Sequence, residues 1–244
     1  MNLKDLQTSH MNQFIGKHMT VFYEQEKSAA QAVFDTLNTK ILSIAQDLHL
    51  CALDVRHTPM IYVFIYDDLK TMHEKYKILV KKTPDEWVVG TCEDNTILLV
   101  SPANPGDDHD FDSIVMVAIH EIVHIYNHLL NPDMSLWMDE GIATYLSNMN
   151  PREFGYQCET IPSMEALQTK DASVFADIEG YPLSYLYIEF LTKVFGWDAV
   201  VELARTNDFE KAFSQSERSI YEQWAAYIKN DGDLFLSREK SFEK

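Results

Sequence analysis

Two histidines and a glutamate stand at helical spacing within an apolar segment that reads His120-Glu121-Ile122-Val123-His124. In a helix, residues four positions apart lie on the same face one turn apart, so both imidazoles can reach one tetrahedrally coordinated ion. Glu121 lies too far round the helix to be a good third ligand, and is placed instead to take a proton from a water that the metal activates. The spacing therefore predicts a zinc site with Glu121 as general base.

This HExxH pattern would arise by chance in roughly one chain in a hundred of this length, from average residue frequencies. The surrounding positions make chance a poorer explanation, because burying titratable groups among apolar side chains without a partner is unfavourable. A metal ion would supply that partner. The apolar neighbours are Ile114, Val115, Val117, Ile119, Ile122, Val123 and Ile125.

A third ligand is needed. The metzincin pattern places a histidine six residues after the second ligand and a glycine at the turn, but Leu130 and Asn127 occupy these positions, so that class is excluded. The other candidate is Glu140, which we expect on the following helix. A turn at residues 131–134 could fold that helix back against the first.

His128 is a further alternative, because it continues the face of His120 and His124 by one more turn. A helix rises about 6 Å over four residues, so three successive turns cannot all converge on one ion. We interpret His128 as a surface residue, or as one that contacts a ligand rather than the metal. Glu140 is therefore predicted as the third ligand.

The remaining pattern predicts an α+β fold that places these residues. A β-branched and aromatic run at 60–66 is typical of a buried strand, and two more strands are expected at 87–90 and 96–100, joined by a polar turn. We expect residues 1–130 to hold N-terminal helices, the small sheet and the zinc-binding helix, and residues 131–244 to form a helical lobe that carries the third ligand. Helical periodicity is present within 20–50 and at 69–80, 111–130 and 138–148.

The net charge of the chain limits the classes of molecule that can bind to it. The formal net charge is -18 and the isoelectric point is near 4.7. Binding to nucleic acid or to an anionic membrane surface needs clustered lysine and arginine, so we expect no nucleic-acid partner and no membrane partner. The composition, 46% hydrophobic and 24% charged, is that of an ordinary folded protein.

Three cysteines, Cys51, Cys92 and Cys158, are an odd number at wide spacing without a Cys-x-x-Cys pair. Neither a disulfide framework nor a thiolate zinc site is indicated, and we expect the thiols to be reduced and buried. The N-terminus lacks a basic region followed by an apolar one, and no stretch is expected to approach the roughly 20 apolar residues of a membrane span. These features predict a cytoplasmic protein.

The string WMDEGIATY at 137–145 resembles the W-x-x-E-G-x-A-x-Y element of gluzincin metallopeptidases, the group that includes thermolysin and the zinc aminopeptidases. With 15 residues between His124 and Glu140, the chain is similar to compact, peptidase-MA-like gluzincins, and it lacks the exopeptidase motif Gly-x-Met-Glu-Asn. The resemblance covers about residues 60–224, of which only the zinc motifs are highly specific. It implies a zincin-like fold in which a sheet lobe and a helical lobe flank a zinc cleft.

The resemblance also implies roles for residues outside the zinc motifs. The last strand of the sheet in that group can bind an extended peptide edge to edge, and here this strand would be 96–100. Tyr181 occupies the position of a tyrosine that hydrogen-bonds the tetrahedral intermediate, although Tyr181, Tyr185 and Tyr187 could all be core aromatics instead. Thr144 stands where some gluzincins carry an acidic residue that orients a zinc histidine, so that partner is unidentified.

These inferences predict a zinc-dependent metallopeptidase that holds Zn²⁺ through His120, His124 and Glu140 and acts on peptide or protein substrates. The rival class is a zinc-bearing binding or regulatory module with a peptidase fold and little activity. Glu121 speaks against it, because a structural zinc site needs no base and usually closes its fourth position with a protein ligand. A third possibility is hydrolysis of non-peptide amides by the same metal chemistry.

Overall fold

The computed structural model describes residues 3–50 and 60–242, with side chains described as far as residue 229. Within these residues the fold is mixed α+β with one five-stranded sheet, which confirms the predicted α+β class. The chain divides into two compact units. The first comprises Met1–Leu130 with Leu146–Asn148, and the second Asn131–Tyr145 with Met149–Lys244.

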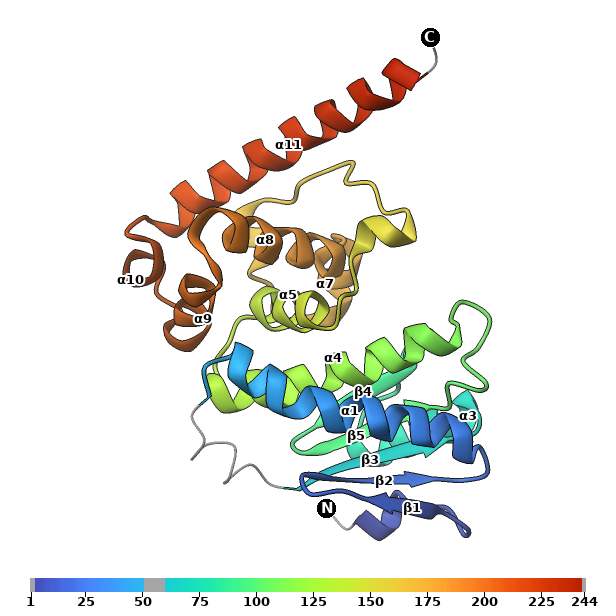
Figure 1. Ribbon diagram of the computed structural model, residues 1–244. Helices are drawn as coiled ribbons and strands as arrows, with labels where there is room; N and C mark the ends of the chain where they lie inside the picture. The colour runs from blue at the N-terminus through green and yellow to red at the C-terminus, as the bar shows by residue number, and fades with distance from the viewer. Residues whose placement is uncertain (1–2, 51–59, 243–244) are drawn as a thin grey trace. The chain divides into compact units, whose positions relative to one another are not determined.

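The first unit holds the sheet and the helices that cover it (Figure 1). The predicted strand after residue 60 and the predicted helices at 69–80 and 111–130 are all present. The elements, in chain order, are η1 (Leu3–Asp5), β1 (Asn12–Ile15), β2 (Met19–Tyr23), α1 (Lys27–Asp47), β3 (Ile61–Tyr66), α3 (Leu69–Leu79), β4 (Gly90–Glu93), β5 (Thr96–Val100) and α4 (Phe111–Leu130).

The strands lie in the order β1-β2-β3-β5-β4. The three inner strands are parallel, while β1 and β4 run antiparallel to their neighbours. β5 is hydrogen-bonded on both sides, so the expectation that residues 96–100 form the edge is wrong. The edge strand on this side of the sheet is β4, which begins at Gly90 rather than at Trp87. The prediction failed because the neighbour order depends on pairing between distant segments.

Different helices cover the two faces of the sheet. Phe22, Phe64 and Leu98 lie on one face, where they pack with Met72 and Leu79 of α3. The Phe22 and Phe64 rings are stacked, with centroids 4.7 Å apart. The opposite face is covered by α1 and α4, which also pack against each other (Figure 1). The HExxH segment therefore lies on a helix that the sheet supports directly.

The helical prediction for residues 20–50 is partly wrong, because its first residues form β2. All five residues of Met19–Tyr23 are buried, and β-branched and aromatic side chains suit a strand covered on both faces. β2 is bonded to β1 on one side and to β3 on the other. The helix begins only at Lys27, and its buried face includes Ala29, Val33, Leu37, Ile41 and Ile44.

The second unit is helical in the described residues (Figure 1). The helix predicted at 138–148 runs two residues earlier, because Ser135 accepts the first hydrogen bonds of its turn. The elements are α5 (Leu136–Leu146), η2 (Pro151–Phe154), α6 (Met164–Leu167), α7 (Ala172–Asp177), α8 (Gly180–Phe195), α9 (Trp197–Thr206), α10 (Phe209–Phe213) and α11 (Glu217–Phe242).

Three stacked aromatic rings form the centre of the second unit. The Tyr187 ring lies between Trp137 and Trp224, with centroid distances of 4.7 and 4.5 Å. All three side chains are buried, and burial raises the pKa of Tyr187 well above its usual value. This stack joins α5, α8 and α11 in one core.

Helix α4 is long and apolar enough to cross a membrane by length and composition alone, so the expectation that no segment reaches this threshold is wrong. Just over half of its apolar window, 56%, is buried inside the protein. A core helix passes the same test, and α4 packs against α1, β4 and β5.

The cysteines differ from the expectation that they are buried. Cys92 on β4 and Cys158 in the second unit are both half-buried. Burial raises the pKa of the Cys158 thiol. Cys51 lies outside the described residues.

Candidate metal centre

Helix α4 begins with a reciprocal cap that fixes where its later residues fall. The Asp110 carboxylate accepts a hydrogen bond from Ser113 N at 2.8 Å, and Asp110 N donates to Ser113 Oγ at 2.9 Å. The bond from Ser113 N also holds the pKa of Asp110 below its usual value. The regular helix that follows places His120 and His124 one turn apart on the same face.

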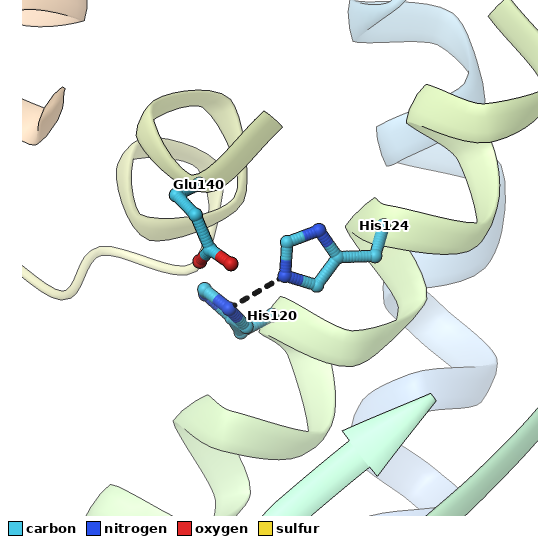
Figure 2. A group of neighbouring side chains, drawn as sticks. All are labelled: His120, His124 and Glu140. Carbon is cyan, nitrogen blue, oxygen red and sulfur yellow. Dashed lines mark hydrogen bonds between the residues drawn. The ribbon is translucent and has the colours of Figure 1, made fainter. Parts of the chain in front are cut away.

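His120, His124 and Glu140 form a group that could hold a metal ion (Figure 2). Each residue offers one ligand atom, and these atoms all lie within 4.8 Å of one another. The two Nε2 atoms are 2.8 Å apart, and the imidazole rings meet edge to face with centroids 4.5 Å apart. All three side chains are half-buried. His128, one turn further along α4, is exposed and lies outside the group.

Glu121 is buried, with 7% of its surface exposed, and it lies against strand β4. A Cβ atom placed on Gly90 would lie 2.5 Å from Val117 Cγ1 and 3.4 Å from Glu121 Oε1. Because Gly90 has no side chain, β4 can pass directly beside the carboxylate. The predicted general base is therefore next to the edge of the sheet.

The surroundings of Tyr76 are acidic, and Glu121 is one of the groups that act on it. Tyr76 of α3 has its pKa raised by burial first, and then by the negative charges of Asp85, Glu121 and Glu93. Three carboxylates are thus close enough to act on one phenol. A cationic group brought to this part of the first unit would be attracted electrostatically.

The turn that precedes α5 is held by side-chain amides within the second unit. Asn131 Nδ2 donates to Ala204 O at 2.8 Å, and Asn207 Nδ2 donates to Asp133 O at 3.1 Å. Asn131 Oδ1 also accepts from Asp133 N at 3.0 Å inside the turn. These bonds tie the turn to the end of α9 and fix where α5 begins.

Helix α5 packs through residues spaced four apart, which lie on one face of the helix. Trp137 stacks on Tyr187 at 4.7 Å, and Tyr145 stacks on Trp197 at 5.5 Å. Gly141 lies midway between these two anchors. The W-x-x-x-G-x-x-x-Y spacing in WMDEGIATY is thus the packing face of α5.

Gly141 allows α5 to approach the backbone of α8. A Cβ atom on Gly141 would lie 2.8 Å from Ser184 O and 2.7 Å from Ile188 Cγ1. These distances are shorter than any van der Waals contact, so only glycine fits. Glu140 directly precedes this contact, and its backbone position is set by it.

Thr144 follows Glu140 by one turn and bonds to the helix itself. Its Oγ1 donates to Glu140 O at 2.7 Å and to Gly141 O at 3.1 Å. The position one turn after Glu140 therefore carries a hydroxyl that bonds to backbone carbonyls of α5, and not a carboxylate.

Tyr181 is half-buried in the first turn of α8, where its ring meets Phe175 edge to face at 5.1 Å. It lines a pocket of about 230 Å³ together with Thr144 and residues from 149 to 156. Tyr185 and Tyr187 are 8% and 3% exposed and belong to the core. Of the three tyrosines, Tyr181 is the one that lines this pocket.

The sequence did not reveal the contacts that hold the predicted residues. Gly90 and Gly141 carried a usable signal, because a glycine inside a strand or a helix often marks a close backbone approach. The pocket carried none, since Met149, Phe154 and Tyr156 have no periodic spacing.

No protein-family model matches the chain, and no curated protein matches it. The arrangement of the side chains therefore carries the functional argument.

Proposed function

We propose that the protein is a zinc-dependent metallopeptidase with a zincin-like fold. The observation that carries the proposal is the group formed by His120, His124 and Glu140, with the buried Glu121 on the same helix as the histidines. Two imidazoles and one carboxylate, with a fourth position left for water or substrate, are a donor set of catalytic zinc sites. The resemblance of the HExxH and WMDEGIATY strings to gluzincins supports the same assignment.

A zinc ion held by these three residues would supply Lewis-acid chemistry, which polarises a carbonyl oxygen and makes water more acidic. Proton transfer is the task of the protein. Glu121 accepts a proton from the attacking water while the oxygen of that water bonds to the carbonyl carbon. Glu121 then delivers a proton to the amine nitrogen as the C–N bond breaks. Packing against β4 restricts the carboxylate to few orientations.

Strand β4 suits an extended peptide substrate. Within the described residues it pairs with β5 alone, so its outer edge offers backbone groups for hydrogen bonds. A peptide that adds to such an edge gains main-chain hydrogen bonds whatever its sequence. Since Glu121 lies beside Gly90 of β4, a peptide bound there would bring its main chain close to the general base.

Tyr181 is proposed to stabilise the tetrahedral intermediate through its phenol. Tyr181→Phe removes the hydroxyl but keeps the ring against Phe175, so we expect kcat to fall about 10²- to 10³-fold without a change in the free energy of unfolding. Steady-state kinetics and urea denaturation measure the two quantities. Tyr185→Phe, in the core, is the matched control and should keep kcat. Full activity in Tyr181→Phe would reduce Tyr181 to a packing residue.

The test of the proposed function is metal analysis combined with cleavage of a mixed peptide library, with and without a chelator. We expect near-stoichiometric zinc and chelator-sensitive cleavage in the wild-type protein, and loss of both in Glu140→Ala. His128→Ala is the matched control, because it removes an exposed histidine from the same helix and should keep both zinc and cleavage.

Each failure has a different meaning. Zinc without any cleavage would indicate a binding or regulatory module, and cleavage of non-peptide amides alone would indicate another kind of hydrolase. A wild-type protein that takes up no zinc would contradict the proposal. A normal zinc content in Glu140→Ala would remove Glu140 from the ligand set.

A further inference from the structure

The pocket beside Tyr181 has the size of one large side chain. Its volume of about 230 Å³ is several times the roughly 30 Å³ that a water molecule occupies. It is also smaller than the roughly 300–1,000 Å³ of sites for drug-sized ligands. The walls come from Thr144 of α5, from the segment 149–156, and from Tyr181 and Pro182 of α8.

The accessible wall of the pocket is apolar, and two of the hydroxyl groups around it are engaged elsewhere. Thr144 Oγ1 donates to Glu140 O, and Tyr156 OH donates to Glu179 Oε2 at 2.7 Å. Burial, together with the bond to Glu179, raises the pKa of Tyr156 and keeps this phenol a donor. A free small molecule is usually oriented by polar contacts in its site. A pocket without them suits a group that is held from elsewhere, as a side chain is held by its peptide main chain.

The pocket shares helix α5 with the candidate metal group. Thr144 lies four residues after Glu140, which is about 6 Å along the helix axis. An extended peptide advances about 3.3 Å per residue, so a side chain one or two residues from the scissile carbonyl can span this distance. Gly141 lies between the two positions and holds α5 against α8, whose first turn carries Tyr181.

Phe154 at the pocket is 62% exposed, which leaves most of a large aromatic surface in water. An apolar side chain that entered the pocket would cover part of that surface. Removal of apolar area from water favours such binding.

We propose that this pocket binds one large apolar side chain, aromatic or branched aliphatic, of the peptide substrate, and so selects which bonds are cleaved. The inference rests on the proposed metallopeptidase function. Under this proposal Phe154 and Met149 determine which substrate side chain is accepted. Neither residue has a role in metal binding or proton transfer in the proposed mechanism.

The test uses pairs of peptides that are identical except for Phe or Ala at one position next to the scissile bond. Zinc-loaded wild-type protein should cleave the Phe peptide with a kcat/KM at least tenfold above that of the Ala peptide at one such position. Phe154→Ala should reduce this ratio, and Met149→Trp, which fills the pocket, should abolish it. Both variants should keep their zinc.

Val194→Ala is the matched control, because Val194 is 51% exposed on α8 and does not line the pocket. It should leave the ratio unchanged. An unchanged ratio of kcat/KM values in Met149→Trp would overturn the proposal. An equal fall in kcat/KM for the Phe and Ala peptides in Phe154→Ala would also overturn it.

A second measurement separates this proposal from the proposed function. If the wild-type protein cleaves no peptide, the function fails, and the pocket is then tested by titration with N-acetylphenylalanine amide followed by NMR. Binding that exceeds that of N-acetylalanine amide and is lost in Met149→Trp supports an apolar side-chain site. No binding by the wild-type protein overturns it.

Discussion

The two proposed functional glutamates are held by close contacts of the same kind but of different stiffness. Beside Glu121, β4 approaches α4 at Gly90, where an added Cβ would meet a valine side chain at 2.5 Å. Next to Glu140, α5 approaches α8 at Gly141, where an added Cβ would meet a backbone carbonyl oxygen at 2.8 Å. A side chain can rotate or be shortened, whereas a helix backbone cannot. The position of Glu140, the proposed metal ligand, is therefore fixed more firmly than that of Glu121, the proposed base.

The largest effect should separate the two glutamates by their chemistry. Glu121→Gln keeps the size of the side chain but removes the proton acceptor, so we expect kcat to fall about 10²- to 10⁴-fold with normal zinc content. Peptide turnover and metal analysis of the same preparation measure this. Turnover at the wild-type rate would show that Glu121 is not the general base.

The next effect should come from the stiffer contact. Gly141→Ala pushes α5 away from α8, so we expect a loss of about 3 kcal/mol in the free energy of unfolding and weaker zinc binding. Denaturation in urea and competition with a chromogenic chelator measure both. Adding Ile188→Ala should not restore zinc binding, because the Ser184 carbonyl oxygen remains in place. Recovery in the double variant would mean that the contact is softer than its geometry indicates.

The softer contact should respond to a compensating change. Gly90→Ala brings a methyl group against Val117, and we expect a loss of about 1–2 kcal/mol together with reduced kcat, because Glu121 is displaced. Val117→Ala opens that space, so the double variant should be more stable than the sum of the two single losses predicts. A double-mutant cycle gives the coupling energy. Strict additivity would contradict a direct collision.

The smallest effect is expected for Asp68→Ala, which destabilises the first unit at a place away from Glu121 and so serves as a control for Gly90→Ala. Asp68 caps α3 by accepting from Thr71 N at 2.8 Å, and Asp68→Ala should lower the free energy of unfolding by about 1 kcal/mol. Zinc content and kcat at neutral pH should not change. A change in either would mean that instability alone can account for the losses in Gly90→Ala.

The effect of Asp68→Ala should also depend on pH. The hydrogen bond from Thr71 N holds the pKa of Asp68 below its usual value. The stabilisation is therefore complete above the ordinary aspartate pKa of about 3.9, and is lost as the pH falls through the lower pKa of the folded state. Unfolding measured at pH 7 and near pH 3 should show a smaller difference between wild type and variant at the lower pH.

Features that depend on local spacing could be predicted from the sequence. The helix of His120 and His124 has the bounds that the sequence predicts, because helical periodicity is a local property of the chain. The three predicted ligands, His120, His124 and Glu140, lie close together for a similar reason, because a short turn joins the two consecutive helices that carry them.

Features that depend on distant partners could not be predicted. The predicted helix from residue 20 is wrong over β2, because this strand depends on pairing with β3, a segment about 40 residues away in the sequence. The edge position of β4 depends on the same long-range order. The pocket could not be predicted, because Thr144, Phe154 and Tyr181 in its walls belong to three segments that meet only in the folded unit.

The aromatic stack gives the protein an optical reporter of its candidate metal site. Of the four tryptophans, Trp137 lies on the helix of Glu140, Trp197 stacks on the same helix, and Trp224 closes the stack. Trp87, in the first unit, is 57% exposed, so we expect it to emit as a solvated indole. Fluorescence from the buried Trp137 and Trp224 should therefore report the ordering of α5 without any added label, while Trp87 supplies an internal standard.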